Sequence, residues 1–241
     1  MLKINKLSFK YSNQKNDVLL FDDFNLEILN GELLSLVGPS GCGKTTLVNI
    51  IAGYLKPLSG DIFINGNKVS SPGKNRIVIN QENDLFEWMT VYQNMKLVVK
   101  NDDVIEKYLA MTNLDKFKYY YPKQLSGGMK KRLSLARAFA ADSDFIIMDE
   151  PFSSLDNQIK EKLHEEILRV AKLSKKTILL VTHDVDEAIF LSDRILLLAH
   201  EPIKINKKIK VPFKHPRAIS IKDSDTFSKI REVIKQNINI I

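Results

Sequence analysis

The sequence predicts an α/β fold built around a parallel sheet, and two observations lead to it. The apolar runs FIIMD (145–149) and TILLVTH (177–183) flank the amphipathic stretch QIKEKLHEEILRVAKL. A strand, a helix and a second strand in that order indicate parallel neighbours in one sheet. A further short apolar run, ELLSLV, leads directly into the glycine-rich segment GPSGCGKTT at 38–46. It suits a third buried strand of this kind.

Length and composition allow one globular unit. With 241 residues, 44% of them hydrophobic, the chain can bury a core as one domain or as a domain with a lobe. A net charge of +7 could indicate nucleic acid or an anionic membrane as a partner. The lysines are scattered along the chain, however, so we interpret them as a solvated surface and expect no nucleic-acid partner.

Targeting signals are not evident in the sequence. No apolar run approaches the ~20 residues that cross a bilayer. The opening stretch MLKINKLSFKY lacks the continuous apolar segment of a signal peptide. The single cysteine excludes an internal disulfide, which favours a reducing cytoplasm. We therefore expect the chain to work on the cytoplasmic side.

The N-terminal part should form strands. KINKLSFKY alternates Ile4, Leu7 and Phe9 with polar residues, as a half-buried strand does, and DFNLEIL repeats the pattern. DIFIN at 61–65 precedes Gly-Asn, which predicts another strand and a turn.

Helical spacing replaces the strand signals between about 84 and 142, in VIEKYLAM and in MKKRLSLARAFA. The tail combines an alternating stretch, PIKINKKIKVPF, with a final helix, DTFSKIREVIKQN. No linker in between is long enough to make the tail an independent domain.

The segment 38–46 matches the pattern G-x-x-x-x-G-K-[ST] in full and follows a predicted strand. Glycines let the backbone wrap so that consecutive N–H groups and the next helix N-terminus point at phosphate oxygens. Lys44 should reach the β- and γ-phosphates, Thr45 should ligate Mg²⁺, and Thr46 should add a phosphate contact. We interpret Cys42 as occupying a variable loop position and not as a redox site. The predicted nucleotide-binding residues here are Gly38, Pro39, Ser40, Gly41, Cys42, Gly43, Lys44, Thr45 and Thr46.

Two acidic residues end the strand FIIMD. Asp149 should emerge at its carboxyl end, where sheets of this kind place ligands, and there hold Mg²⁺ directly or through water. Glu150 can orient and polarise the water that attacks the γ-phosphate. A solvated turn is the alternative, but an all-apolar strand and a phosphate loop favour the catalytic interpretation.

His183 closes the strand TILLVTH. A lone histidine is usually structural, but this one follows a second buried strand of the same sheet. Its imidazole could therefore hydrogen-bond the γ-phosphate and hold the geometry of Glu150 and the water.

The stretch LSGGM at 125–129 opens a predicted helix with two adjacent glycines, which are poor helix formers. In the order GPSGCGKTT, Gln81, LSGGM, FIIMDEP, SSLD (153–156) and VTHDVDEA (181–188), the chain resembles an ATP-binding-cassette (ABC) ATPase over nearly its whole length. The resemblance implies a head-to-tail dimer in which Ser126, Gly127 and Gly128 of one subunit close over the ATP of the other.

Further site residues are implied by the same resemblance. Tyr11 would stack on adenine, although its neighbour Phe9 on the same strand face leaves a purely structural Tyr11 open. Gln81 would ligate Mg²⁺ and link the nucleotide to a helical lobe that contacts membrane subunits. Asp156 would belong to a loop that passes between the two subunits.

The implied fold is a P-loop NTPase with a RecA-like core sheet, an N-terminal antiparallel β subdomain and a helical lobe. We expect a single domain over 1–241. The core with the β subdomain would comprise about 1–83 and 143–200, the helical lobe with LSGGM about 84–142, and a C-terminal extension 201–241.

LSGGM, DEPFSSLD, VTHDVDEA and VPFKHPR resemble the importer ATPases for nitrate, sulfonate, taurine and related small solutes. The resemblance implies an ATP- and Mg²⁺-dependent ATPase subunit at the cytoplasmic face of the membrane. Its partners would be a second ATPase subunit, forming a homodimer, a membrane permease and an extracytoplasmic solute-binding protein. Three alternatives stay open: an importer for another solute class, a soluble ABC ATPase of DNA repair or translation, and a regulatory module without turnover. Intact Glu150 and His183 speak against the last.

Overall fold

The computed structural model describes residues 1–12, 17–82, 84–153, 155–199 and 202–238. Their strands form two sheets, and the larger one has six strands in the order β10-β9-β3-β8-β7-β6. All neighbouring pairs in it are parallel except β10 with β9. Its strands are β3 (Leu33–Val37), β6 (Arg76–Ile79), β7 (Phe145–Asp149), β8 (Thr177–Thr182), β9 (Arg194–Ala199) and β10 (Lys204–Lys210).

The parallel register brings the carboxyl ends of three strands to one edge. Asp149 pairs with Val181, and Val37 pairs with Thr182. Every residue of β3, β7 and β8 is buried. These three strands are the continuous apolar runs from which a parallel sheet was predicted, and that prediction is confirmed.

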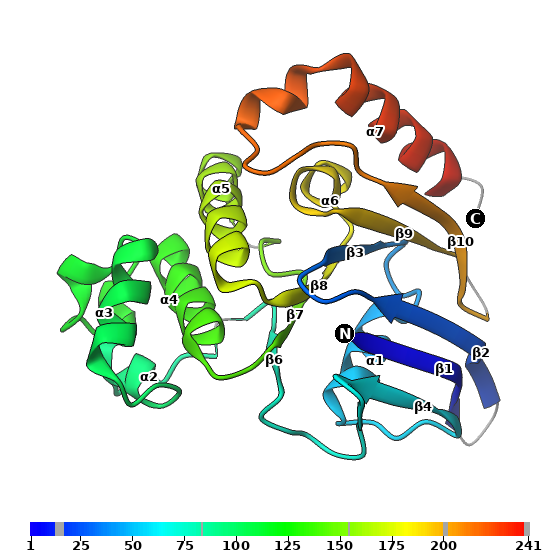
Figure 1. The fold of residues 1–241 in the computed structure, drawn as a ribbon, viewed down its shortest axis with the longest axis horizontal. Coiled ribbons are helices and arrows are strands. Elements are labelled where there is room, and N and C mark those ends of the chain that lie inside the picture. The colour runs from blue at the N-terminus through cyan, green and yellow to red at the C-terminus, as the bar shows by residue number, and fades with distance from the viewer. Residues whose placement is uncertain (13–16, 83, 154, 200–201, 239–241) are drawn as a thin grey trace.

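The second sheet is antiparallel and four-stranded, in the order β2-β1-β4-β5. It contains β1 (Leu2–Ser12), β2 (Asp17–Ile28), β4 (Ser59–Ile64) and β5 (Asn67–Lys68). The turn between the last two has positive φ at both Asn65 (48°) and Gly66 (80°), as a two-residue hairpin turn requires. This sheet forms the lower right of Figure 1.

Helix α1 (Lys44–Ala52) lies between the two sheets, because its apolar side chains share one buried cluster with β1, β2 and β3. A second cluster fills the opposite face of the large sheet, under α5 (Asn157–Ser174), α6 (Val185–Leu191) and α7 (Asp225–Ile238). In Figure 1 these three helices lie above the large sheet. The sheet is therefore covered on both faces, as a parallel sheet must be.

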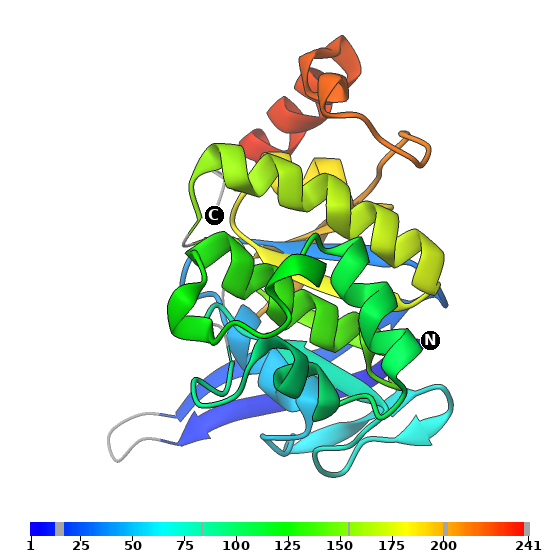
Figure 2. The ribbon, with the colours of Figure 1, turned by 90° about the vertical axis from the view of Figure 1, so that its left-hand side faces the viewer.

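Residues 84–142 contain helices and no strand. They form α2 (Val91–Lys96), α3 (Asp102–Met111), α4 (Gly127–Ala140) and the short 3₁₀ turns Asp115–Phe117 and Pro122–Gln124. Buried side chains of α2, α3 and one side of α4 make a third cluster that includes no residue of either sheet, whereas Leu135, Ala138 and Phe139 of α4 pack in the second cluster with the large sheet. This segment, called the helical lobe below, projects to the left in Figure 1 and faces the viewer in Figure 2.

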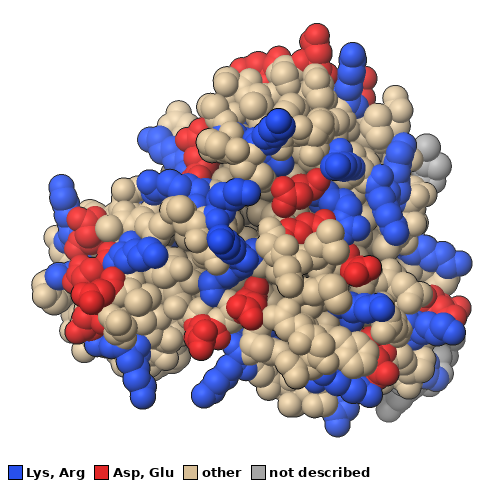
Figure 3. Space-filling model, in the orientation of Figure 1, with Lys and Arg blue, Asp and Glu red and all other residues tan. Residues whose placement is uncertain are grey.

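The tail follows the predicted pattern of strand and helix. Strand β10 adds antiparallel to the sheet edge, a 3₁₀ turn covers Ile219–Asp223, and α7 packs on α6 and β9. In the part of the chain that the structure describes, no helix is both long and apolar enough to span a membrane. Lys and Arg side chains are spread across the face in Figure 3 and alternate with acidic groups, which agrees with a solvated surface.

Candidate functional site

The glycine-rich loop lies between β3 and α1, and its last residue has a geometric reason to be glycine. Gly43 caps α1 in the left-handed region, with φ at 86°. A Cβ there would lie 2.6 Å from Ile203 Cδ1 and 2.8 Å from Leu20 Cδ2. The loop can therefore enter the helix in this tight path only without a side chain at 43. The helix N-terminus and its free N–H groups face the carboxyl edge of the sheet.

Lys44 closes the loop on itself. Its Nζ donates to the main-chain oxygens of Gly38 (2.9 Å) and Pro39 (2.7 Å), and the side chain is buried. The ammonium thus lies inside the ring of the loop, where an incoming phosphate would compete with two carbonyl acceptors. Contact of Lys44 with the β- and γ-phosphates stays a prediction.

Asp149 has the features of a cation ligand. It is the last residue of β7, and burial raises the pKa of its carboxyl group while a hydrogen bond from the Thr45 side chain lowers it. Its Oδ1 is buried and has no hydrogen-bond partner in the part of the chain that the structure describes. An unpaired buried carboxylate oxygen is costly, and a carboxylate beside a threonine hydroxyl is the hard oxygen donor set that Mg²⁺ prefers. The residues present therefore fit a magnesium ion.

Glu150 and His183 meet at the same edge. Glu150 Oε2 lies 3.1 Å from His183 Nδ1, and both side chains are partly exposed. The φ of Glu150 is +46°, a region that non-glycine residues seldom adopt. Its N–H still donates to the Val181 oxygen at 2.9 Å, as though β7 continued for one more residue. This bent backbone delivers the carboxylate to the histidine, and we refer to the two residues as the Glu150–His183 dyad.

Tyr11 lies beside the loop helix. Its hydroxyl is 3.1 Å from Thr46 Oγ1, and its ring meets Phe9 edge-on with 5.0 Å between centroids. Phe9 is buried in the core, whereas Tyr11 is 44% exposed. Of the two aromatic residues on this strand, only Tyr11 offers a ring to a ligand at the loop.

Gln81 is held by a residue that sequence reasoning missed. Lys131 Nζ donates to the main-chain oxygens of Asn80 (2.9 Å) and Gln81 (3.1 Å). Burial lowers the pKa of Lys131 to about 8, opposed by the charge of Asp84. Residue 131 lies on the inner face of α4, three positions after Gly128 and four before buried Leu135, but helical spacing alone does not indicate its main-chain partners. The scattered lysines predicted a solvated surface, and for Lys131 the structure corrects this, because its side chain is buried.

The two glycines of LSGGM have different surroundings. Ser126 caps α4 by accepting from the N–H of Met129 at 3.3 Å. A Cβ at Gly127 would meet no atom of the described residues within 4 Å, but one at Gly128 would lie 2.8 Å from Ile159 Cγ2. The sequence interpretation assigned both glycines to phosphate approach, whereas in the structure Gly128 also makes room for helix α5.

Asp156 caps α5 by accepting from the N–H of Ile159 at 3.0 Å. Ile159 is also the residue that a Cβ at position 128 would contact. The predicted stretch 153–156 includes Ser154, which lies outside the described residues. Across the described ranges, no hydrogen bond joins residues 126–128 to the loop 38–46. Within one chain, the parallel register and the contacts above bring together the loop, Asp149, the dyad and Tyr11, whereas none of the hydrogen bonds of the described residues links Ser126, Gly127 or Gly128 to them.

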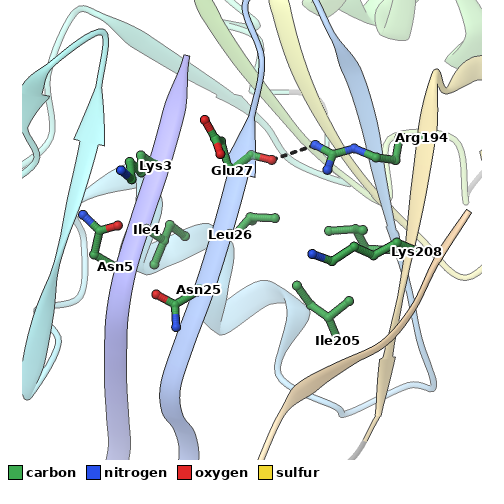
Figure 4. Close-up of a pocket in the computed structure, with 10 residues that line it drawn as sticks. Lys3, Ile4, Asn5, Asn25, Leu26, Glu27, Arg194, Ile205 and Lys208 are labelled. Carbon is green, nitrogen blue, oxygen red and sulfur yellow. Dashed lines mark hydrogen bonds between the residues drawn. The ribbon is translucent and has the colours of Figure 1, made fainter. Parts of the chain in front are cut away.

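A crevice of about 310 Å³ lies elsewhere, between the antiparallel sheet and the edge of the large sheet (Figure 4). Lys3 and Lys208 line it from opposite sides, and Arg194 Nη2 donates to the main-chain oxygen of Glu27 at 2.7 Å. None of the predicted site residues borders this crevice. The candidate site is therefore the sheet edge with the phosphate loop.

Comparison with known proteins agrees with this geometry. A family model described as ABC transporter matches residues 21–153. The chain is 38% identical to the aliphatic sulfonates import ATP-binding protein SsuB of Bacillus cereus, over 98% of this chain and 94% of the relative. It is 41% identical to the taurine import ATP-binding protein TauB of Roseobacter denitrificans, over 88% and 82%. A dimeric ATP-binding cassette in a post-hydrolysis state, bound to ADP and Pi, superposes with a TM-score of 0.75 at 26% identity, covering 89% of this chain and 100% of that chain.

Proposed function

The chain belongs to the ABC transporter family of ATP-binding proteins. We propose that it is the ATP-hydrolysing subunit of an importer for small sulfonate-, taurine- or nitrate-like solutes. The observation that carries the proposal is the Glu150–His183 dyad, 3.1 Å apart at the sheet edge that also holds the phosphate loop and Asp149. The names of the relatives, an aliphatic sulfonates import and a taurine import ATP-binding protein, support the sulfonate- and taurine-like part of this solute class.

In this proposal the loop binds the phosphates of ATP through its N–H groups, through Lys44 and through Thr46, while Tyr11 stacks on adenine. Thr45, Asp149 and Gln81 would hold Mg²⁺, which would supply positive charge to offset the negative charge of the phosphate groups. The Glu150 carboxylate accepts a hydrogen bond from the attacking water and places it in line with the γ-phosphorus. His183 holds Glu150 through Nδ1 and leaves Nε2 free to meet a γ-phosphate oxygen.

Two chains would complete each site. Ser126, Gly127 and the α4 N-terminus of one subunit would cover the γ-phosphate bound by the other, with the Asp156 loop running between them. Support comes from the open space at Gly127 and from the dimeric cassette among similar structures. We expect a homodimer.

The assembly would couple to the membrane through the helical lobe. We propose the core with the β subdomain as about 1–83 and 143–200, the lobe as 84–142, and the extension as 201–241. The lobe has a buried cluster of its own, which supports its movement as a unit, while Leu135, Ala138 and Phe139 of α4 keep it packed against the core. The dimer would sit on the cytoplasmic face of a membrane permease, and an extracytoplasmic protein would deliver the solute.

Replacement of Glu150 by Gln tests the proposal. Glu150→Gln keeps the shape and the His183 contact but removes the charge that orients water. Steady-state ATP hydrolysis should fall to background, while ATP should now trap a dimer that size-exclusion chromatography detects. The control is Glu232→Gln, at an exposed glutamate of α7. Unchanged turnover in Glu150→Gln would refute the assigned chemistry.

The dimer and the partner have their own tests. Ser126→Arg should block hydrolysis while a single chain still binds ATP; full activity would refute the cross-subunit site. Co-purification with a hydrophobic membrane protein would support the importer. Co-purification with nucleic acid instead would favour a soluble ABC ATPase of DNA repair or translation.

A further inference from the structure

A buried polar pair lies directly behind the candidate site, between helices α5 and α6. His164 Nε2 is 3.1 Å from Glu187 Oε1, and the side chains are only 4% and 3% exposed. Neither residue belongs to the predicted site. A buried carboxylate is expensive unless its oxygens are hydrogen-bonded. The hydrogen-bond partners of the two Glu187 carboxylate oxygens therefore show which parts of the chain the pair supports.

The second oxygen of Glu187 supports the chain around His183. Glu187 Oε2 accepts from the hydroxyl of Thr182, and the same hydroxyl oxygen accepts from the N–H of Asp184 at 3.0 Å. Thr182 and Asp184 are the residues immediately before and after His183. The Glu187 carboxylate thus holds Thr182 directly and Asp184 through the Thr182 hydroxyl, while the imidazole of His183 itself stays more than half exposed.

His164 also contacts the chain around Glu150. Its ring meets the ring of Phe152 edge-on, with 4.8 Å between centroids, and Phe152 is buried two residues after Glu150. The main-chain oxygen of Glu150 accepts from the Ser153 hydroxyl at 3.0 Å, which fixes the turn between them. One histidine side chain therefore touches the supports of both members of the dyad.

His164 lies on α5, two turns after the Asp156 cap. A helix moves as a rigid element, so a displacement of the Asp156 loop would carry His164 with it. The buried contacts of His164 would pass that displacement to Thr182 and to Phe152. This path joins the proposed subunit interface to the reacting groups through the α5 backbone, the contacts of His164 and Glu187, and the short chain segments that connect Thr182 to His183 and Phe152 to Glu150.

We propose that His164 and Glu187 are positioning residues that hold the Glu150–His183 dyad in alignment with helix α5. The proposal rests on the function proposed above, because it gives the dyad a task. Neither residue touches the nucleotide. Their effect falls on the rate of the chemical step and not on ATP binding, since a water displaced by about 1 Å can cost up to about 100-fold in rate.

Two substitutions separate the hydrogen bond from the packing. His164→Phe keeps an aromatic ring against Phe152 but removes the donor to Glu187. His164→Gln keeps a donor near the Nε2 position but removes the ring. We expect kcat for ATP hydrolysis to fall about 10- to 100-fold in His164→Phe with a nearly unchanged KM. His164→Gln should recover most of the lost kcat.

The matched control is Ile167→Val, a conservative change at a buried position one turn further along the same helix. It should lower thermal stability slightly and leave kcat unchanged. Glu187→Gln is the second variant if His164→Phe does not fold, and it should lower kcat in the same way. In a Glu150→Gln background, His164→Phe should still allow ATP to trap the dimer, because nucleotide binding does not use the pair.

The outcomes distinguish the two proposals. If Glu150→Gln retains turnover, the proposed function fails whatever His164 does. If Glu150→Gln is inactive but folded His164→Phe has the kcat of the unmodified chain, only the positioning role is overturned. A rise in KM with unchanged kcat would also overturn it, because the pair would then act on binding.

Discussion

Lys131 Nζ donates to the main-chain oxygen of Gln81 at 3.1 Å, and this bond joins the helix that follows LSGGM to the proposed magnesium ligand. The same ammonium donates to Asn80, the preceding residue. The lysine is almost completely buried, so its charge is stabilised by two carbonyl dipoles and by the nearby carboxylate of Asp84. The loop around Gln81 and helix α4 are therefore connected within one chain by these two hydrogen bonds.

The buried charge of Lys131 predicts a pH-dependent stability. Its pKa is about 8 in the folded chain and 10.5 in the reference state, so between these pH values the unfolded chain binds more protons. The free energy of unfolding should therefore rise with pH from 8 to 10.5, on the order of 3 kcal/mol at about 1.4 kcal/mol per pKa unit. Below pH 8 the lysine is protonated in both states and contributes no slope.

Urea unfolding of the protein and of Lys131→Met over this pH range isolates the effect from other groups that titrate there. From pH 8 to 10.5, the unfolding free energy of the unmodified protein should rise relative to that of Lys131→Met. A matched control is the adjacent, more exposed Lys130→Met, which loses only a surface ion pair with Glu87. A difference that stays constant with pH would contradict the buried charge of Lys131.

The two glycines of LSGGM predict opposite effects of alanine. Gly127→Ala meets open space within the chain and should stabilise α4 by at most about 1 kcal/mol. It should nevertheless slow ATP hydrolysis, because the methyl group would face the phosphate of the other subunit. Thermal unfolding and steady-state hydrolysis measured on one preparation check both parts. Full activity would contradict the cross-subunit role.

Gly128→Ala should act through packing instead. Its Cβ would lie 2.8 Å from Ile159 Cγ2, and overpacking of this kind costs about 1–3 kcal/mol. Ile159→Ala removes that methyl group, so the double variant should be less destabilised than the sum of the single variants. Simple additivity in urea unfolding would show that the contact with α5 is not the reason for this glycine.

Cys42 should be unreactive in the folded chain. Burial raises the pKa of its thiol, although the Lys44 ammonium opposes the shift. The thiolate is the nucleophile, so less of it exists at neutral pH than for an ordinary cysteine. Iodoacetamide should label Cys42 slowly in the native protein and rapidly in urea, as measured by mass spectrometry. Fast native labelling would contradict this, and Cys42→Ala should keep ATPase activity.

Sequence patterns predicted elements whose burial is continuous or alternates along the chain. Strands β3, β7 and β8 are buried on both faces and therefore have mostly apolar runs, with Ser35 the buried polar residue within β3. β6, α2 and α6 were not predicted, because four, six and seven residues give too few repeats to establish a period. β9 was missed although its apolar run RILLLA is as long as the run of β8. These elements are held in place by packing or strand pairing with segments that are distant in the sequence.

The candidate site divides in the same way. Asp149 and Glu150 were predictable because they directly follow an apolar strand, and the loop 38–46 because it matches a complete pattern. Lys131, His164 and Glu187 were not, since a charged residue on a helix usually faces water and only tertiary packing buries these three. Their sequence neighbours carry no signal for the partners they find on other elements.

The C-terminal extension is joined to α6 at both ends by arginines whose contributions should differ. Arg217 is buried and donates from Nη1 to the main-chain oxygens of Phe190 (2.7 Å) and Ser192 (3.0 Å), at the end of α6. Arg231 makes a bidentate salt bridge with Asp186 near the start of α6, at 2.6 and 2.9 Å, but both side chains are partly exposed. Both arginines hold the helix that follows His183.

Replacing each arginine by methionine shows which end matters. Arg217→Met leaves buried carbonyl groups without donors and should lower the free energy of unfolding by about 2–4 kcal/mol. Arg231→Met removes an ion pair that solvent already screens and should cost less than about 1 kcal/mol. Urea unfolding of both variants, followed by far-UV circular dichroism, gives the two values. If Arg231→Met proved as costly as Arg217→Met, the extension would be attached through α7, and not through the segment that caps α6.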